Sequence, residues 1–313
     1  MEGSTFGARA TPGVEPLGVA RRRWGEELIR ALLFLAAAVS VLTTILIVVA
    51  LLKESISFFD EVKLDFLTDS EWSPLFSDPQ FGIRQLLVGT FMITGIAILV
   101  AIPIGLGSAI YLSEYASPRA RRAIKPILEV LVGVPTIVFG FFALTFITPE
   151  ILQDILHLKV EGFNALAAGL VMGIMIVPTI ASISEDAMTA VPQGLREGAY
   201  GLGATKRQVS TKVVFPAAIS GVIASIVLGI SRGVGETMIV LIAAGLLPSS
   251  SPNPLDGHAT ITTFMGATAK GDNPVGTIGY ESIFACGLTL FALTLLMNMV
   301  AIRFVRRYRE VYE

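Results

Sequence analysis

Residues 192–216 read PQGLREGAYGLGATKRQVSTKVVFP, the longest polar run between two long apolar segments in the second half of the chain. The run carries one acid, Glu197, and several basic residues: Arg196, Lys206, Arg207 and Lys212. An excess of lysine and arginine is typical of loops on the cytoplasmic side of a membrane. We therefore expect this loop to lie between two membrane spans, in the cytoplasm.

The same loop has the signals of two short helices. Pro192 suits the first turn of a helix, and Gly203 lies where a left-handed residue would end it. Thr205 followed by Gln208 is a capping-box pair that predicts the start of a second helix. These positions predict a helix-turn-helix element rather than a loose connector.

An apolar stripe runs along the first of these helices. Leu195, Ala199 and Leu202 are spaced i, i+4 and i+7, which places them on one face. One interpretation is an amphipathic connector that lies on the lipid headgroups. The other is a docking element whose stripe is buried by a partner protein.

Composition indicates a protein that crosses the membrane several times. The chain has 313 residues, of which 53% are hydrophobic and only 15% are charged. A soluble domain is about a quarter charged. The net charge of −2 gives no indication of nucleic-acid binding. The lone Cys286 excludes an internal disulfide, and His157 and His258 form no metal-binding cluster and are expected on solvated loops.

Six apolar segments are long enough for the ~20 residues that a bilayer core requires. They are Leu28–Leu52, Leu86–Leu112, Ile127–Thr148, Asn164–Ser184, Ala217–Leu247 and Ser282–Arg303. We expect a cytoplasmic tail at 1–27, a permeation domain at 28–303 with the loop 192–216 inside it, and a second cytoplasmic tail at 304–313. The predicted fold is an all-α polytopic membrane protein with six transmembrane helices.

Loop charges alternate along the chain. Basic clusters occur at Arg21–Arg23, around Arg119–Lys125, in the loop 192–216 and at Arg303–Arg309, whereas the intervening loops are acidic. The positive-inside rule then places both termini in the cytoplasm. Glu185 and Asp186 end the fourth segment; they either mark where that helix leaves the membrane or contact a sister subunit.

The loop 192–216 resembles the EAA loop of bacterial ABC importer permeases. Glu197, Ala199, Gly203 and Pro216 match that pattern, while Gly198 replaces its first alanine. Four further stretches are similar to the permease subunits of bacterial phosphate importers: FLTDSEWSP (66–74), IPIGLGSAIYLSEYA (102–116), KPILEVLVGVPTIVFGFF (125–142) and PTIASISEDAMTAVP (178–192). The likeness covers the chain from about Leu28 to its C-terminus.

The resemblance implies a permease fold and a set of partners. These are a sister permease subunit, a dimer of ATPase subunits, an extracytoplasmic phosphate-binding protein and membrane lipid. No GxxxxGK[ST] motif is present, so ATP would be bound by the partner ATPase and this chain would need no cofactor. The family's coupling helix maps onto residues of the loop: Leu195, Glu197, Gly198, Ala199, Leu202 and Gly203.

SRGVGET, residues 231–237, places two charges inside the fifth apolar segment. Arg232 and Glu236 are spaced i, i+4, so on one helix they would share a face. Each charge costs about 2.5–3.5 kcal/mol at the centre of a membrane helix, which excludes a position facing lipid. One interpretation is a structural ion pair within the bundle. The other is an anion-binding site on the substrate path, to which Ser231 and Thr237 would add hydroxyls.

Phosphate fits such an anion-binding site. The arginine fork matches phosphate oxygens, and a glutamate can accept the proton that phosphate still carries near neutral pH. Fully ionised sulfate would offer that glutamate no donor. The resemblance, in which the matching stretch looks like SRxxGET, implies the same role for Arg232 and Glu236. A permease for another oxyanion, such as molybdate or sulfate, is the alternative.

Two other classes of function fit the sequence less well. Residues 229–233 fit GxSxG, the motif of a serine hydrolase, but that chemistry needs a strand-turn-helix or a histidine inside the bundle. A membrane scaffold or sensor without transport would explain neither the intramembrane charges nor the docking loop. The sequence therefore predicts a transporter subunit without a catalytic site of its own.

Overall fold

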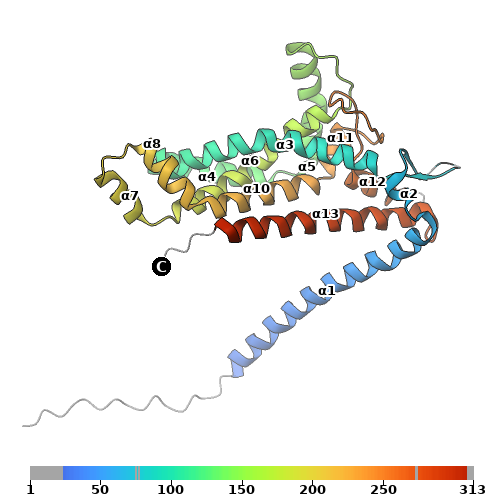
Figure 1. Ribbon diagram of the computed structural model, residues 1–313, viewed down its shortest axis with the longest axis horizontal. Helices are drawn as coiled ribbons and strands as arrows, with labels where there is room; N and C mark the ends of the chain where they lie inside the picture. Colours follow the sequence, from blue (N-terminus) through green and yellow to red (C-terminus); the bar gives the residue numbers. More distant parts are fainter. Residues whose placement is uncertain (1–23, 75, 77, 272–273, 309–313) are drawn as a thin grey trace, which may run out of the picture. The chain divides into compact units, whose positions relative to one another are not determined.

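A computed structural model of the chain describes residues 24–74, 76, 78–271 and 274–308 (Figure 1). The predicted N-terminal tail lies outside the described residues up to residue 23, as does the predicted C-terminal tail from residue 309. Apart from two short strands, the regular elements of the described part are helices, which confirms the all-α fold. In order they are α1 (Trp24–Val62), α2 (Asp65–Thr68), β1 (Trp72–Ser73), β2 (Gln80–Phe81), α3 (Arg84–Ile110), η1 (Tyr111–Tyr115), α4 (Pro118–Gly133), α5 (Thr136–Phe142), η2 (Ala143–Ile155), α6 (Ala165–Thr189), α7 (Gln193–Gly201), α8 (Lys206–Val209), η3 (Ser210–Val214), α9 (Phe215–Ala217), α10 (Ile219–Val234), α11 (Met238–Ala243), α12 (Ile261–Thr268) and α13 (Ile278–Tyr308).

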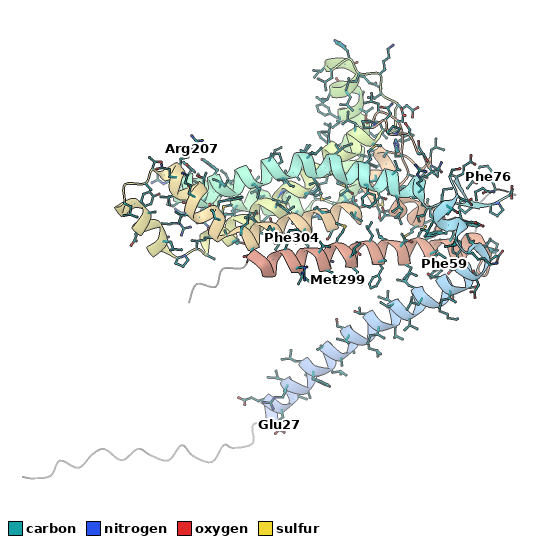
Figure 2. The ribbon with its side chains drawn as sticks, in the orientation of Figure 1. Glu27, Phe59, Phe76, Arg207, Met299 and Phe304 are labelled. Atoms are coloured by element: carbon teal, nitrogen blue, oxygen red, sulfur yellow. The ribbon has the colours of Figure 1, made fainter. Side chains whose placement is uncertain are left out.

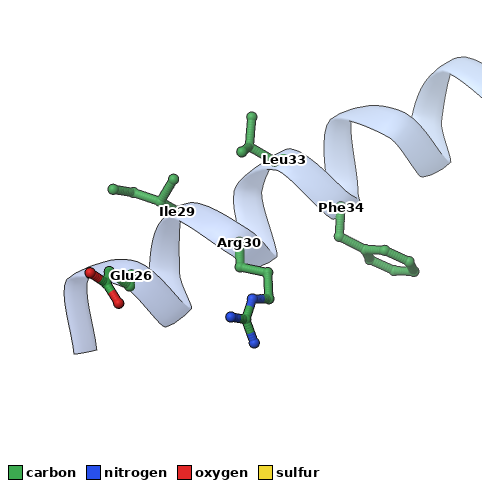
Figure 3. Close-up of a pocket in the computed structure, with 5 residues that line it drawn as sticks. All are labelled: Glu26, Ile29, Arg30, Leu33 and Phe34. Carbon is green, nitrogen blue, oxygen red and sulfur yellow. The ribbon is translucent and has the colours of Figure 1, made fainter. Parts of the chain in front are cut away.

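The chain divides into two units, residues 1–50 and residues 51–313. The described part of the first unit belongs to a single helix, α1, which beyond Arg30 is apolar on all sides as expected for a helix in lipid. Figure 3 shows a shallow groove on its first turns, lined by Glu26, Ile29, Arg30, Leu33 and Phe34. Because all of these side chains come from neighbouring turns of one helix, the groove belongs to the helix surface and is not a binding cavity.

Several helices are long and apolar enough to span a membrane. Among the described residues there are five: Gly25–Val62, Arg84–Tyr115, Thr136–Ile155, Ala165–Thr189 and Ile278–Val305. A sixth span is obtained if Lys206–Ala217 and Ile219–Val234 are counted together, although the two helices are bent by 71°. The six predicted spans therefore correspond to six regions of the structure.

The third predicted span begins too early. Ile127–Thr148 was expected to be one helix, but α4 ends at Gly133 and the spanning helix starts at Thr136. Pro135, between them, lacks a backbone N–H and restricts the residue before it to extended conformations. The apolar residues at the end of α4 therefore belong to an amphipathic helix outside the span.

The fifth predicted span, Ala217–Leu247, is broken. Helix α10 ends at Val234, and α11 starts only at Met238. The 16 residues of α10 rise about 24 Å, less than the ~30 Å thickness of a bilayer core. An α10 that starts at the membrane surface would therefore end within the bilayer core, with the break at the SRGVGET stretch.

Helices α3, α6 and α10 pack side by side through glycines (Figure 1). A Cβ atom added to Gly169 of α6 would lie 2.7 Å from the Cβ of Ile96 in α3, and one added to Gly173 would lie 2.8 Å from the Ala97 carbonyl oxygen. On the other face of α6, a Cβ on Gly229 would lie 3.0 Å from Ile176. Glycines at this spacing let helices approach closely, and these contacts are of that kind.

An aromatic cluster closes the end of the second unit opposite α7 and α8. Edge-to-face contacts join its rings, with centroids 4.9–6.2 Å apart, and its members are Phe58, Phe59, Phe66, Trp72, Phe81 and Phe264. The hairpin of β1 and β2 pairs Trp72 with Phe81 and so builds two members into the cluster. Figure 2 shows Phe59 and Phe76 at this end and Arg207 at the opposite end. The two ends match the acidic and basic sides predicted from the loop charges.

Cysteine labelling tests this orientation. The native Cys286 is fully buried, so the background is expected to be unreactive. Ser70 and Thr211 are both exposed, at the acidic and the basic end. Ser70→Cys should react with a membrane-impermeant maleimide in intact cells, and Thr211→Cys should react only after permeabilisation. The opposite pattern would show that the termini lie outside.

Candidate functional site

The Ser231–Thr237 stretch forms the break between α10 and α11. Ser231 and Arg232 lie in the last turn of α10, which ends at Val234. Glu236 is buried, and its Oε1 atom accepts the backbone N–H groups of Met238 at 3.1 Å and Ile239 at 3.2 Å. A carboxylate is favourable at a helix N-terminus, so Glu236 stabilises the restart of the helix as α11.

Arg232 and Glu236 do not form an ion pair. The expectation of a shared helix face was wrong, because the helix ends between the two residues. The half-buried Arg232 donates from Nη1 to the Thr179 hydroxyl of α6 at 3.1 Å, the one side-chain bond it makes to the described residues. The other guanidinium donors make no hydrogen bond to the described residues. The interpretation as a mutual structural pair is not supported by this geometry.

Two further helices complete the surroundings of the break. The Ser231 hydroxyl lies 3.5 Å from Oδ1 of Asn298 in α13, and the Thr262 hydroxyl of α12 donates to the Glu236 carbonyl oxygen at 2.7 Å. Thr237 is half-buried beside the break. Sequence reasoning missed Thr179, Asn298 and Thr262. Their signal was a polar side chain within, or next to, an otherwise apolar segment.

No serine hydrolase chemistry is built around Ser231. His258, expected on a solvated loop, is instead fully buried. Its ring nitrogens lie 3.1 Å from the Asp256 carbonyl oxygen and 2.8 Å from the Ser251 carbonyl oxygen, so they serve the loop before α12. His157 is exposed, as expected. Neither histidine reaches Ser231 through any contact of the described chain.

The predicted helix-turn-helix of residues 192–216 is confirmed. Pro192 precedes α7, Gly203 has a φ of +81°, and the Thr205–Gln208 capping box starts α8. The left-handed conformation at Gly203 is one that residues with a side chain rarely adopt. Each of these features depends on neighbouring residues alone, which is why the sequence could predict them.

The apolar stripe predicted on α7 is only partly exposed. Leu202 is 91% exposed and Leu195 is 36% exposed, whereas Ala199 packs on an apolar cluster of the chain itself. Glu197 and Gly198 are exposed. A hollow of about 390 Å³ lies beside this surface, lined by Ala199, Leu202, Gly203, Ala204, Gln208, Lys212 and Val213. The chain thus leaves two leucines and a hollow on one side of α7 uncovered.

Charged side chains hold the helices together beneath this surface. Glu185 at the end of α6 is buried and pairs with Arg121 and Lys125 of α4; Lys125 also binds Asp186 at 2.7 Å. Glu185 and Asp186 therefore do more than mark the end of a span, since they fasten α4 to α6. Their partners lie about 60 residues away in the chain, which the sequence alone did not show.

The chain is a helical membrane protein with several spans, a broken and charged span and a structured basic loop. These features are typical of a transport subunit. The chain belongs to the binding-protein-dependent transport system inner membrane components, whose family model matches residues 101–310. It is accordingly a multi-pass protein of the inner membrane, and this family works with ATPase and substrate-binding partners.

Individual relatives agree with the family. The probable ABC transporter permease protein YqgH of Bacillus subtilis (strain 168) is 36% identical over 248 residues, 79% of each chain. The phosphate transport system permease protein PstC of Haemophilus influenzae is 31% identical over 301 residues, 89% of this chain and 92% of that protein.

Solved structures show the same fold. A chain of a bacterial alginate ABC transporter, crystallised with its alginate-bound periplasmic protein, matches with a TM-score of 0.60 and 18% identity, over 94% of this chain and all of that one. A chain of the MetNI methionine ABC transporter matches with a TM-score of 0.54 and 20% identity, over 73% of this chain and 95% of that one. At such identities the likeness concerns the fold alone.

Proposed function

We propose that this chain is the PstC-like permease subunit of an ATP-driven phosphate importer and forms half of its translocation path. The observation that carries the proposal is Arg232, a half-buried cation at the break of an otherwise apolar span that makes one side-chain hydrogen bond to the described residues. A charge in that position is costly unless it serves a ligand or a partner. The relatives named as phosphate permeases supply the choice of ligand.

The residues around the break fit hydrogen phosphate. The Arg232 guanidinium presents a planar fork of donors to the phosphate oxygens. Glu236 uses Oε1 for the α11 backbone and keeps Oε2 for the phosphate O–H. Ser231 and Thr237 add hydroxyls at the two ends of the break. A fully ionised anion would meet the Glu236 carboxylate without a proton to share, so this arrangement disfavours sulfate.

The exposed side of α7 is the proposed docking site for a separate ATPase. Leu195 and Leu202 are the apolar contacts, Gly198 and Gly203 leave room for a close approach, and Glu197 is an exposed charge on another face of the same helix. ATP would be bound and hydrolysed by a PstB-like dimer, so the permease itself needs no cofactor. The remaining proposed partners are a PstA-like sister permease and a PstS-like extracytoplasmic phosphate-binding protein.

A permease for molybdate or sulfate is the second candidate, because its arginine would bind any oxyanion. Radiolabelled phosphate uptake separates the two. Cells that lack the chain should regain uptake when it is restored, and a hundredfold excess of sulfate or molybdate should leave that uptake unchanged. Restoration of sulfate or molybdate uptake instead of phosphate uptake would assign the chain to the second candidate.

A further inference from the structure

The side of α7 that faces the spans is anchored by one buried arginine. Arg196 is 8% exposed, while its neighbours Leu195 and Glu197 are exposed. Its Nη2 atom donates to Oε1 of Glu114 at 3.1 Å and to the Met188 carbonyl oxygen at 2.7 Å, and its Nη1 atom donates to the Val191 carbonyl oxygen. The Arg196 guanidinium alone therefore donates all of these hydrogen bonds.

The partners of Arg196 belong to two different spans. Glu114 lies in η1, which continues α3 to the end of the span Arg84–Tyr115. Met188 lies at the C-terminal end of α6, and Val191 lies in the turn between α6 and α7. Arg196 thus fastens α7 to both spans at once, and only the fork geometry of arginine allows this from one side chain.

The two spans pack closely against each other as one α3–α6 body. A Cβ atom on Gly105 of α3 would lie 2.9 Å from the Cβ of Ile180 in α6, and the contacts at Gly169 and Gly173 are as close. Such close packing couples the positions of the two helices. A displacement of α7 that reaches this body through Arg196 would move α3 and α6 together.

A buried ion pair of this kind is better suited to directing force than to adding stability. The side chains of Arg196 and Glu114 are only 10% and 5% exposed. Burial removes water from both charges, and that cost cancels much of their attraction, so replacing such a pair often leaves stability unchanged. The apolar cluster around Val191, Val209 and Val214 already holds α7 in place without any directional bond.

We propose that Arg196, bonded to Glu114 and to the end of α6, is the positioning residue that transmits movement of α7 to the α3–α6 body. The proposal rests on the proposed function, in which α7 docks on an ATPase. Arg196 touches neither substrate nor nucleotide. Its loss should separate ATP hydrolysis from transport without removing the docking surface, because Leu195 and Leu202 are exposed whereas Arg196 is buried.

The test compares phosphate moved per ATP hydrolysed by the complete complex in liposomes. The double variant Arg196→Met, Glu114→Gln removes the charge at both ends and leaves neither buried alone. It should copurify with the ATPase and keep the thermal stability of the parent, while the transport ratio falls by roughly 5- to 150-fold, the range of typical couplings between sites. Arg122→Met, which removes an exposed arginine that bonds only within its own turn, should keep the ratio.

Each other outcome has a definite meaning. An unchanged transport ratio in a stable double variant would overturn the proposal. If the double variant does not fold, Glu114→Gln alone decides, because it keeps the Arg196 bonds to α6 and weakens only the tie to α3; an unchanged ratio there would also overturn the proposal. Failure of the parent chain itself to copurify with the ATPase would refute the proposed function instead.

Discussion

Phosphate uptake should fall at least about 30-fold in Arg232→Gln at matched membrane expression. Loss of one partner from a buried, charge-assisted contact costs roughly 2–5 kcal/mol, and each 1.4 kcal/mol is a factor of ten. The variant also leaves the negative charge of Glu236 in the break without the positive charge of Arg232. The remaining carboxylate repels an anion. The measurement is radiolabelled uptake in cells, with ATP hydrolysis by the purified complex as the check of assembly.

Two matched variants sharpen this prediction. Glu236→Gln keeps an oxygen that accepts the Met238 and Ile239 N–H groups, so the break should keep its shape and uptake should exceed that of Arg232→Gln. It should also admit sulfate more readily, because the carboxylate that disfavours ionised anions is gone. Arg84→Gln removes an exposed arginine at the start of α3 and should transport normally. Near-normal uptake by Arg232→Gln would return Arg232 to a structural role.

Copurification of the ATPase should be lost in Gly198→Trp. A Cβ atom at Gly198 meets no atom within 4 Å, so the indole would project from α7 without disturbing the chain itself. Overpacking a fitted contact costs roughly 1–3 kcal/mol, enough to dissociate the complex during purification. Ala199 and Gly203 are less suitable positions, since Ala199 packs on the chain's own cluster and Gly203 has a positive φ.

The control for this prediction is Gly162→Trp. Gly162 is also exposed with open space at its Cβ position, but it lies in an acidic loop between two spans. The ATPase should copurify with this variant at the yield of the parent. Equal yields from Gly198→Trp and the parent would exclude the exposed side of α7 as the docking site.

Local chemistry explains which features could be predicted from the sequence. The α7–α8 turn follows from Pro192, Gly203 and the Thr205–Gln208 pair, whose preferences act over a few residues. The spans follow from runs of apolar residues long enough for a bilayer. The close contacts at Gly169 and Gly173 follow from a spacing that places both on one helix face.

Contacts between distant residues could not be predicted in the same way. Arg196 and Glu114 are separated by 82 positions, and nothing in either local sequence specifies the other. The break at Gly235 was missed for a different reason. Apolar residues continue on both sides of it, and the restart of the helix depends on the Glu236 side chain, which accepts backbone N–H groups of α11. The burial of His258 likewise depends on carbonyl groups that the loop folds around it.

The 71° bend between Lys206–Ala217 and Ile219–Val234 also concerns the inner leaflet of the membrane. If α10 crosses the bilayer along its normal, the preceding segment lies close to the membrane plane. Its basic residues Lys206, Arg207 and Lys212 are exposed there. Each such residue gains about 1 kcal/mol near a surface of anionic phospholipid, and salt weakens that attraction. The phospholipid composition of the host cell therefore sets part of the energy that holds this segment in position.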